Sequence, residues 1–180
     1  MYHKKIIIVG KSGSGKDYIM NQLEKNGFKR CIKWTTRPIR KNEINGTTYH
    51  FTDNDNFIKN IKEDNFIVKQ KIIISSSPSK PIWYYGITNN EFNKSDFMMM
   101  TPFEINELKQ HKDINKIAFI IYLDIDKKIR ESRVLERSDY NDSLKRRFKK
   151  DDIDFKDFED YHLIIKNPEF KIEEVLEKLQ

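Results

Sequence analysis

A glycine-rich segment near the start of the chain has the residue types and spacing of a phosphate-binding loop. Residues 10–17 read GKSGSGKD, which fits the pattern G-x-x-x-x-G-K. Backbone N–H groups of such a loop can surround a phosphate, and its lysine can reach the terminal phosphates of a nucleotide. The loop follows an apolar run at 4–9 and precedes an amphipathic stretch at 17–25. This strand-to-helix context argues against a chance glycine-rich turn, and it predicts ATP binding by Gly10, Ser12, Gly13, Ser14, Gly15, Lys16 and Asp17.

The last position of this loop departs from the usual pattern. Asp17 stands where a serine or threonine usually binds Mg²⁺. A carboxylate is a hard oxygen ligand for Mg²⁺, directly or through water, although its charge repels a triphosphate unless the metal offsets it. We therefore expect Asp17 to contact Mg²⁺ or its waters.

A second group of residues has the donors to bind another phosphate. Residues 35–40 read TTRPIR, and Glu43, Gly46, Tyr49 and Phe51 follow. Arg37 and Arg40 are three residues apart and can converge on one phosphate through bidentate hydrogen bonds. Tyr49 adds a phenolic donor, and Glu43 can hold an arginine in place. The competing interpretation is a surface cluster of ion pairs, which contributes little to stability.

Together these two motifs resemble the guanylate kinase family. That family carries T-T-R-x-x-R-x-x-E-x-x-G-x-x-Y-x-F, and its fixed positions are all present as Thr35, Thr36, Arg37, Arg40, Glu43, Gly46, Tyr49 and Phe51. Residues 84–86 (YYG) resemble a further family motif. The arginines that resemble those of the family's lid are Arg133, Arg137 and Arg147, and Asn167 resembles an asparagine near its adenine pocket. The resemblance spans nearly the full chain and is close over the first 52 residues.

The resemblance implies a role for each matching residue and implies ATP and Mg²⁺ as cofactors. Lys16, Arg133, Arg137 and Arg147 would be the catalytic residues, and Asn167 would join the loop in binding ATP. The acceptor monophosphate would be bound by Arg37, Arg40, Tyr49 and Tyr85, with Glu43 and Gly86 in support. Phosphoryl transfer depends mostly on positioning and charge neutralisation, so these roles fit the chemistry. For Arg130 and Arg146 we expect a solvated, charged helix face.

The sequence departs from the family where the family recognises guanine. Lys33 stands at a serine position, and Ile87 follows the Tyr-Gly pair where the family has serine or threonine. Met99 and Thr101 occupy the two acidic positions of a family L-D-I-D motif. The family's guanine-binding glutamate has no clear counterpart, since Val68 or a residue in 69–76 occupies its region. The base of the acceptor therefore stays open.

A Leu-Asp-Ile-Asp sequence does occur later, at residues 123–126. It follows a later apolar run and leads into the arginine-rich stretch. We expect Asp124 and Asp126 to start that helix, where acidic residues favour the helix dipole, rather than to bind the base or a metal.

Apolar runs alternate with helical patterns along the chain. We expect strands at 4–9, 96–100, 116–123 and 161–165 and helices at 17–25, 102–111 and 126 to about 150, with an interruption near 138–142. Asn167 and Pro168 would cap a final amphipathic helix. Between the first helix and the second strand, β-prone pieces at 47–52 and 71–75 flank a helix near 53–63.

This alternation predicts an α/β fold, a P-loop NTPase-type parallel sheet with helices on both faces. We expect a single domain over 1–180, with its core at 1–32, 89–135 and 148–180. The β-rich insert at 33–88 would bind the nucleoside monophosphate, and an arginine-bearing lid would span 136–147.

Composition narrows the class of protein further. The chain has 180 residues, a net charge of +6 and one cysteine, Cys31, which we expect to be a buried apolar residue. The lysines are spread over the chain rather than clustered, so nucleic acid is not an expected partner. With neither a signal peptide nor a membrane span apparent, we expect a cytoplasmic monomer or homodimer that acts on small-molecule nucleotides.

Four functions stay open from the sequence. The first is a nucleoside monophosphate kinase that uses ATP and acts on GMP or dGMP. The second is the same chemistry on another (deoxy)nucleoside monophosphate or on ribose bisphosphate, because the Gly-Lys-Asp ending resembles the ribose bisphosphate phosphokinase branch. The third is a non-catalytic guanylate kinase-like interaction module, against which the intact loop argues. The fourth, a nucleic-acid-binding ATPase, rests only on charge.

Overall fold

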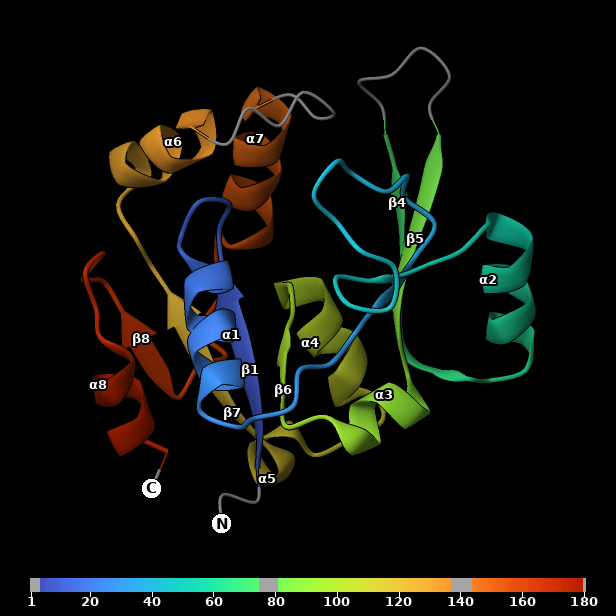
Figure 1. Cartoon of the computed structure of the whole chain (residues 1–180), viewed down its shortest axis with the longest axis horizontal. Coiled ribbons are helices and arrows are strands. Elements are labelled where there is room, and N and C mark those ends of the chain that lie inside the picture. The colour runs from blue at the N-terminus through green and yellow to red at the C-terminus, as the bar shows by residue number, and fades with distance from the viewer. Residues whose placement is uncertain (1–3, 75–80, 137–143, 180) are drawn as a thin grey trace.

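Two four-stranded sheets organise residues 4–74, 81–136 and 144–179, which are the residues that the computed structural model describes (Figure 1). The first sheet is parallel, with strand order β6-β1-β7-β8. Its strands are β1 (Lys5–Gly10), β6 (Phe97–Met99), β7 (Ala118–Leu123) and β8 (Leu163–Ile165). All four predicted strands of the parallel sheet are therefore confirmed, with small shifts at their ends.

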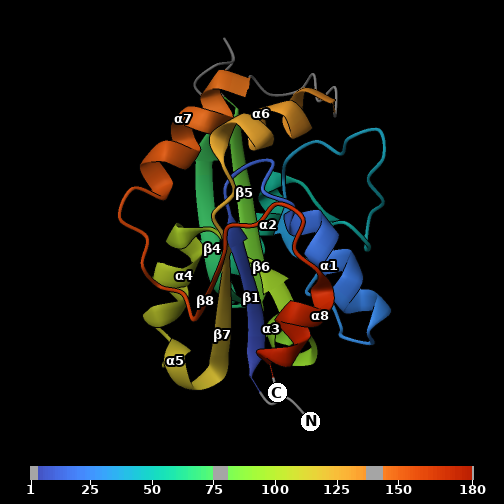
Figure 2. The same cartoon turned by 90° about the vertical axis from the view of Figure 1, so that its left-hand side faces the viewer.

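Helices cover both faces of this parallel sheet, as the unbroken apolar run of β1 predicts. Ile6 and Ile8 lie in one buried cluster with side chains of α1 (Lys16–Lys25) and α8 (Ile172–Glu177). Ile7 and Val9 point the other way and share a second cluster with α4 (Pro102–Lys109). Figure 2 shows α1 and α8 on one side of β1 and β7, and α4 and α5 (Ile114–Ile117) on the other.

The second sheet is built from the segment that we expected to form the β-rich insert. Its strands, in the order β3-β2-β5-β4, are β2 (Trp34–Thr35), β3 (His50–Phe51), β4 (Phe66–Ile73) and β5 (Ile82–Thr88). Helix α2 (Asn54–Lys62) packs beside it, and the Asp53 carboxylate caps this helix by accepting a hydrogen bond from Asn56 N at 2.7 Å. The boundaries 33 and 88 of a separate unit remain a prediction.

Two helices stand over the carboxyl ends of the parallel strands, where ligands of such sheets bind (Figures 1 and 2). These are α6 (Lys127–Glu136) and α7 (Leu144–Asp154). The Asp126 carboxylate accepts a hydrogen bond from Lys128 N at 2.8 Å, which confirms Asp126 as a residue that starts this helix. Much of the predicted lid, at 137–143, lies outside the described residues.

The start of the last helix differs from the prediction. The last helix begins at Ile172 with Lys171 at its N-cap position, and Asn167 Oδ1 accepts a hydrogen bond from Glu169 N in a turn that precedes the helix. The prediction that Asn167 and Pro168 cap this helix was therefore wrong.

Cys31 is buried, as expected, and burial raises the pKa of its thiol to about 11. In the described residues, none of the helices is both long enough and apolar enough to cross a membrane.

Aromatic stacking holds α2 on the second sheet. The fully buried Phe57 ring stacks on Phe66, with ring centres 4.4 Å apart, and on Tyr84 at 5.4 Å. Gly86 leaves room for this stack, since a Cβ there would lie 2.7 Å from the Phe66 ring. The neighbouring Tyr85 belongs to the expected phosphate site, so the stack also positions functional residues.

We expect Phe57→Ala to lower the free energy of unfolding by about 3–5 kcal/mol, because it leaves a cavity among stacked rings. The matched control is Phe103→Ala on α4, whose side chain is 44% exposed and which should lose less than about 1 kcal/mol. Urea denaturation of both variants measures the difference. Equal losses would mean that the stack does not stabilise this sheet.

Candidate active site

The glycine-rich loop joins β1 to α1 and wraps around the side chain of its own lysine. Lys16 Nζ donates hydrogen bonds to Gly10 O at 2.6 Å and to Lys11 O at 2.9 Å. Ser14 is fully buried beneath the loop, and a Cβ on Gly10 would lie only 2.5 Å from its Oγ. The backbone of the loop is therefore closely packed, as a structure that presents N–H groups to a phosphate requires.

The first turn of α6 packs directly against this loop. Gly13 has a φ of +78°, and a Cβ there would lie 2.4 Å from the carbonyl oxygen of Arg130. The Arg130 side chain is 3% exposed, and it donates hydrogen bonds to Ile125 O at 2.9 Å and Ser12 O at 3.3 Å. The prediction that Arg130 faces solvent was wrong, because α6 starts over the loop and turns this residue inward.

A carboxylate from α7 reaches the same loop, and no local pattern predicted this contact. Asp151 Oδ2 accepts a hydrogen bond from Ser12 N at 2.7 Å and lies 3.9 Å from Arg130 Nη1. An anionic group thus binds one of the backbone N–H groups that the loop offers to phosphates. A phosphate bound at Ser12 N would have to displace Asp151.

A second cavity opens beside the start of α1, at the other side of the loop. It is lined by Gly15, Tyr18, Arg133, Glu136, Pro168, Glu169, Phe170 and Lys171. Arg133 Nη2 donates a hydrogen bond to Pro168 O at 3.0 Å, so this predicted lid residue lies next to the loop. Asn167 is exposed and is not among the lining residues, although it directly precedes Pro168.

The remaining predicted lid residues have different outcomes. Arg147 on α7 lines the main cavity described below. Arg137 lies outside the described residues, and so does the side chain of Arg146. Lys150 and Asp154, which the sequence analysis did not single out, also line the main cavity and form an ion pair of 2.8 Å.

The arginine cluster of the second sheet is organised by one carboxylate. Glu43 Oε1 accepts a hydrogen bond from Arg37 Nη2 at 2.6 Å, and Glu43 Oε2 accepts one from Arg40 N at 2.8 Å. Burial is the largest influence on the pKa of Arg37 and lowers it, but the hydrogen bond that Arg37 donates to Glu43 and the Coulombic attraction of nearby groups together outweigh burial and hold the pKa of the guanidinium above its ordinary value. The expected contact between Glu43 and an arginine is therefore present, and it involves a buried guanidinium.

Two tyrosines complete this cluster. The ring of Tyr49 lies 6.2 Å from that of Tyr85 and 5.6 Å from the Arg37 guanidinium. Burial raises the pKa of both phenols above the ordinary value for tyrosine. Both side chains are therefore protonated at neutral pH and can donate hydrogen bonds to a phosphate.

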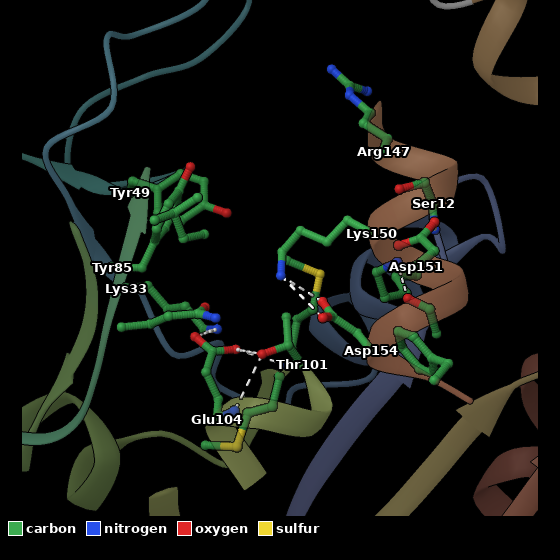
Figure 3. A pocket seen from close by; sticks show the side chains of 17 residues that line it. Ser12, Lys33, Tyr49, Tyr85, Thr101, Glu104, Arg147, Lys150, Asp151 and Asp154 are labelled. Atoms are coloured by element: carbon green, nitrogen blue, oxygen red, sulfur yellow. Dashed lines mark hydrogen bonds and ion pairs between the residues drawn. The ribbon is translucent and has the colours of Figure 1, made fainter. Parts of the chain in front are cut away.

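One cavity brings the loop and the tyrosines together (Figure 3). Gly10, Ser12 and Lys16 line it from the loop, and Tyr49 and Tyr85 line it from the second sheet. In Figure 3 the tyrosines lie across the cavity from Arg147 and Asp151 of α7. Arg37 and Arg40 are described but are not among its lining residues; the Arg37 guanidinium lies 5.6 Å from the ring of Tyr49, which does line it.

The floor of this cavity holds most of the positions at which the sequence departs from the family pattern. Lys33, Met99 and Thr101 line it, together with Gln70 and Glu104. Lys33 Nζ lies 2.6 Å from Glu104 Oε1. Ile87 and Val68, by contrast, are buried in the apolar core.

The described residues contain no group of three or more His, Cys, Asp or Glu side chains that could hold a metal ion. Asp17 is exposed in the first turn of α1, directly after the loop lysine. Mg²⁺ in nucleotide sites takes one or two protein ligands, with phosphate oxygens and waters as the rest. The Asp17 carboxylate fits that mode of binding.

A phosphate loop that faces phenolic and cationic donors across a single cavity defines a P-loop phosphotransferase. Comparison with known proteins narrows this class. A family model described as "Guanylate kinase" matches residues 2–180. A guanylate kinase of Mycoplasma mobile is 33% identical over 165 residues, which are 83% of this chain and 78% of that protein. A guanylate kinase of Clostridium tetani is 25% identical over 181 residues, with 97% of this chain and 82% of that protein covered.

The fold agrees with these matches. The crystal structure of guanylate kinase from Anaplasma phagocytophilum superposes with a TM-score of 0.63 at 16% sequence identity, over 99% of this chain and 84% of that one. The chain belongs to the guanylate kinase family.

We expect Gly13→Ala to displace the loop from α6, because its Cβ would collide with the Arg130 carbonyl. Gly27→Ala is the matched control: Gly27 also has a positive φ, but nothing lies within 4 Å of its Cβ position. The control should lose only the backbone cost of about 1–2 kcal/mol. Gly13→Ala should lose more stability and most of its ATP affinity, measured by urea denaturation and calorimetry. Equal stability losses with ATP binding intact would contradict the close packing of the loop.

Proposed function

We propose that the chain is a nucleoside monophosphate kinase that transfers the γ-phosphate of ATP to GMP or dGMP. The observation that carries this proposal is the single cavity lined by the loop residues Gly10 and Lys16 on one side and by Tyr49 and Tyr85 on the other. Donor and acceptor phosphates bound at these two sets would meet within it. Membership of the guanylate kinase family supports GMP as the acceptor.

On the donor side, the loop would hold the ATP phosphates through its backbone N–H groups. Lys16 would donate its hydrogen bonds to phosphate oxygens in place of the carbonyls of Gly10 and Lys11. Ser12 N would likewise donate to a phosphate oxygen in place of Asp151. The cavity between Tyr18, Arg133 and Pro168 supports placing the adenosine beside the start of α1, with Asn167 at its margin.

On the acceptor side, Tyr49 and Tyr85 would donate hydrogen bonds to the monophosphate. Arg37, fixed by Glu43, and Arg40 would supply positive charge near the tyrosines. Gly86 would serve by leaving room for the rings that position Tyr85. Closure of the segment that carries Arg133, Arg137 and Arg147 would bring further positive charge to the transferred group.

The reaction then requires little covalent work from the protein. An oxygen of the acceptor phosphate attacks the γ-phosphorus of ATP in line, the bond to the bridging oxygen breaks, and ADP leaves. The acceptor oxygen is already ionised at neutral pH, since the second phosphate pKa is about 6, so no general base is needed. Lys16 and the arginines offset the charge, and exclusion of water limits hydrolysis of ATP.

Mg²⁺ would be held by Asp17, directly or through water, and would neutralise charge on the ATP phosphates. We further propose a cytoplasmic enzyme that acts on small-molecule nucleotides, as a monomer or homodimer. Transfer to ribose bisphosphate is less well supported, because the tyrosine pattern around Tyr49 matches that of nucleoside monophosphate kinases. The intact loop disfavours a non-catalytic module.

An acceptor panel tests the proposed function. The protein is incubated with ATP and Mg²⁺ and with GMP, dGMP, CMP, UMP, dTMP or ribose bisphosphate, and ADP release is recorded. We expect rapid release with GMP and dGMP and little without an acceptor. Absence of acceptor-dependent ADP release would remove the kinase proposal, and a best rate with a pyrimidine nucleotide would remove GMP as the substrate.

The role of Asp17 is tested by the Mg²⁺ requirement. We expect Asp17→Asn to raise the Mg²⁺ concentration for half-maximal activity by about tenfold or more, because a charged oxygen ligand or its water contact is lost. Asp55→Asn is the matched control, since Asp55 is also an exposed carboxylate in the first turn of a helix. An unchanged Mg²⁺ midpoint in Asp17→Asn would show that this carboxylate does not serve the metal.

A further inference from the structure

A buried ion pair forms part of the floor of the main cavity. Lys33 is 7% exposed and Glu104 is 2% exposed, and Lys33 Nζ donates a hydrogen bond to Glu104 Oε1 at 2.6 Å. Both residues line the cavity that also contains Tyr49 and Tyr85. Desolvating two charges is costly, so a buried ion pair is weak evidence for stability. Its position at the ligand cavity is therefore the informative fact.

Glu104 is held in place independently of Lys33. Its second oxygen, Oε2, accepts hydrogen bonds from Thr101 N at 2.8 Å and from Thr101 Oγ1 at 3.2 Å. Thr101 Oγ1 in turn accepts a hydrogen bond from Glu104 N, which completes a capping box at the start of α4. Both carboxylate oxygens are thus occupied, and Glu104 acts as a fixed anchor for the lysine.

Lys33, in contrast, has donors to spare. An ammonium group carries three N–H donors and no acceptor. Among the described residues, Glu104 is the hydrogen-bond partner of the Lys33 ammonium. The remaining donors belong to a side chain that lines the cavity, where a ligand can accept from them.

The position of Lys33 suits a base better than a phosphate. Thr35 pairs with Tyr85 across the sheet, and Lys33 precedes Thr35 by two residues, so the Lys33 backbone lies about 7 Å from that pair, towards the N-terminal end of β2. Figure 3 shows Lys33 and Glu104 below the two tyrosines, towards the floor of the cavity. Met99 and Met100 line the cavity as well and offer apolar surface to a flat ring.

We propose that Lys33, anchored by Glu104, donates to O6 and N7 of a purine and selects 6-oxopurine nucleotides as acceptors. The inference rests on the proposed function and assigns the residue that would select the base of its acceptor. Guanine and hypoxanthine both present O6 and N7 as acceptors, whereas adenine presents an amino group in place of O6. The Lys33 ammonium and the amino group of adenine are both hydrogen-bond donors, so both would stay unpaired when buried against each other. This cost in free energy disfavours binding of adenine.

The same arrangement discriminates little between guanine and hypoxanthine, which differ by the 2-amino group. A carboxylate is the natural acceptor for that group, but Met99 and Thr101 replace the acidic residues of the family pattern, and Val68 is buried in the core. Glu104 already accepts from Lys33 and Thr101. The other carboxylates of the cavity, Asp151 and Asp154, lie on α7 and bind Ser12 N and Lys150. Gln70, which is 9% exposed, offers the cavity a neutral amide, whose oxygen can accept from N1–H of either base.

Steady-state kinetics with GMP, IMP and AMP at fixed ATP test this inference. For the unmodified protein we expect kcat/KM for IMP within about threefold of that for GMP, and a value for AMP at least about 100-fold lower. Lys33→Met should lower kcat/KM for GMP and IMP by about 10- to 100-fold and change AMP much less. The KM for ATP should stay the same.

Two further variants separate recognition from stability. Lys33→Met leaves the Glu104 carboxylate without its ion-pair partner, so the double variant Lys33→Met/Glu104→Gln is measured beside it, with thermal unfolding of both. Lys71→Met is the matched control, since Lys71 is exposed on β4, and it should behave as the unmodified protein does.

Two results would overturn the inference. One is a preference for GMP over IMP above about 100-fold, which would require a cavity residue that accepts a hydrogen bond from the 2-amino group. The other is an equal loss for all three nucleotides in a folded Lys33 variant, which would assign the lysine to the phosphate or to structure. Absence of any acceptor-dependent ADP release would contradict the proposed function instead.

Discussion

The close approach of the glycine-rich loop to the first turn of α6 is the constraint on which the rest of the site depends. With 2.4 Å between a Cβ at position 13 and the Arg130 carbonyl, no side chain other than hydrogen fits there. This contact places α6 directly over the carboxyl end of β1. It buries the Arg130 guanidinium against backbone carbonyls of the loop and of the segment after β7, which joins three parts of the chain.

Because α6 is held on the loop, α7 comes to lie at the edge of the main cavity. Asp151 of α7 occupies Ser12 N, and Arg147 and Lys150 line the cavity itself. The second sheet supplies the opposite wall, where two protonated tyrosines line the cavity and Glu43 binds both the Arg37 guanidinium and the Arg40 backbone. Phosphoryl transfer needs two phosphate groups at short range with their charge offset. This arrangement supplies cationic and hydrogen-bonding groups on both sides of one space.

Much of this could be predicted from the sequence, because local patterns determine it. The apolar run of β1 predicted a strand covered on both faces, and the spacing of Arg37, Glu43 and Tyr49 predicted residues that the structure does bring together. The predictions that failed did so because tertiary contacts, rather than local patterns, determine where these side chains lie. Arg130 has the pattern of a solvated helix face until α6 is placed on the loop. Asp151 carries no local signal, since its partner is a backbone N–H 139 residues away.

The floor of the cavity was also beyond local reasoning. Lys33 could be identified as a departure from the family pattern, but its partner Glu104 lies 71 residues away, at the start of α4. A helix over 102–111 was predicted from the sequence, yet the carboxylate that completes the capping box at its start lines the cavity as well. One residue thus combines a local role with a long-range one, and only the fold reveals the second.

If donor and acceptor phosphates share one cavity, a bisubstrate analogue should bind at both ends of the site at once. Calorimetry would follow the binding of adenosine and guanosine joined by five phosphates. We predict one molecule per chain, with an affinity at least about 100-fold tighter than that of ATP or GMP alone. Lys16→Ala and Arg40→Ala should each weaken it, because each removes one end of the site. An affinity no tighter than that of ATP, unchanged by Arg40→Ala, would contradict the account.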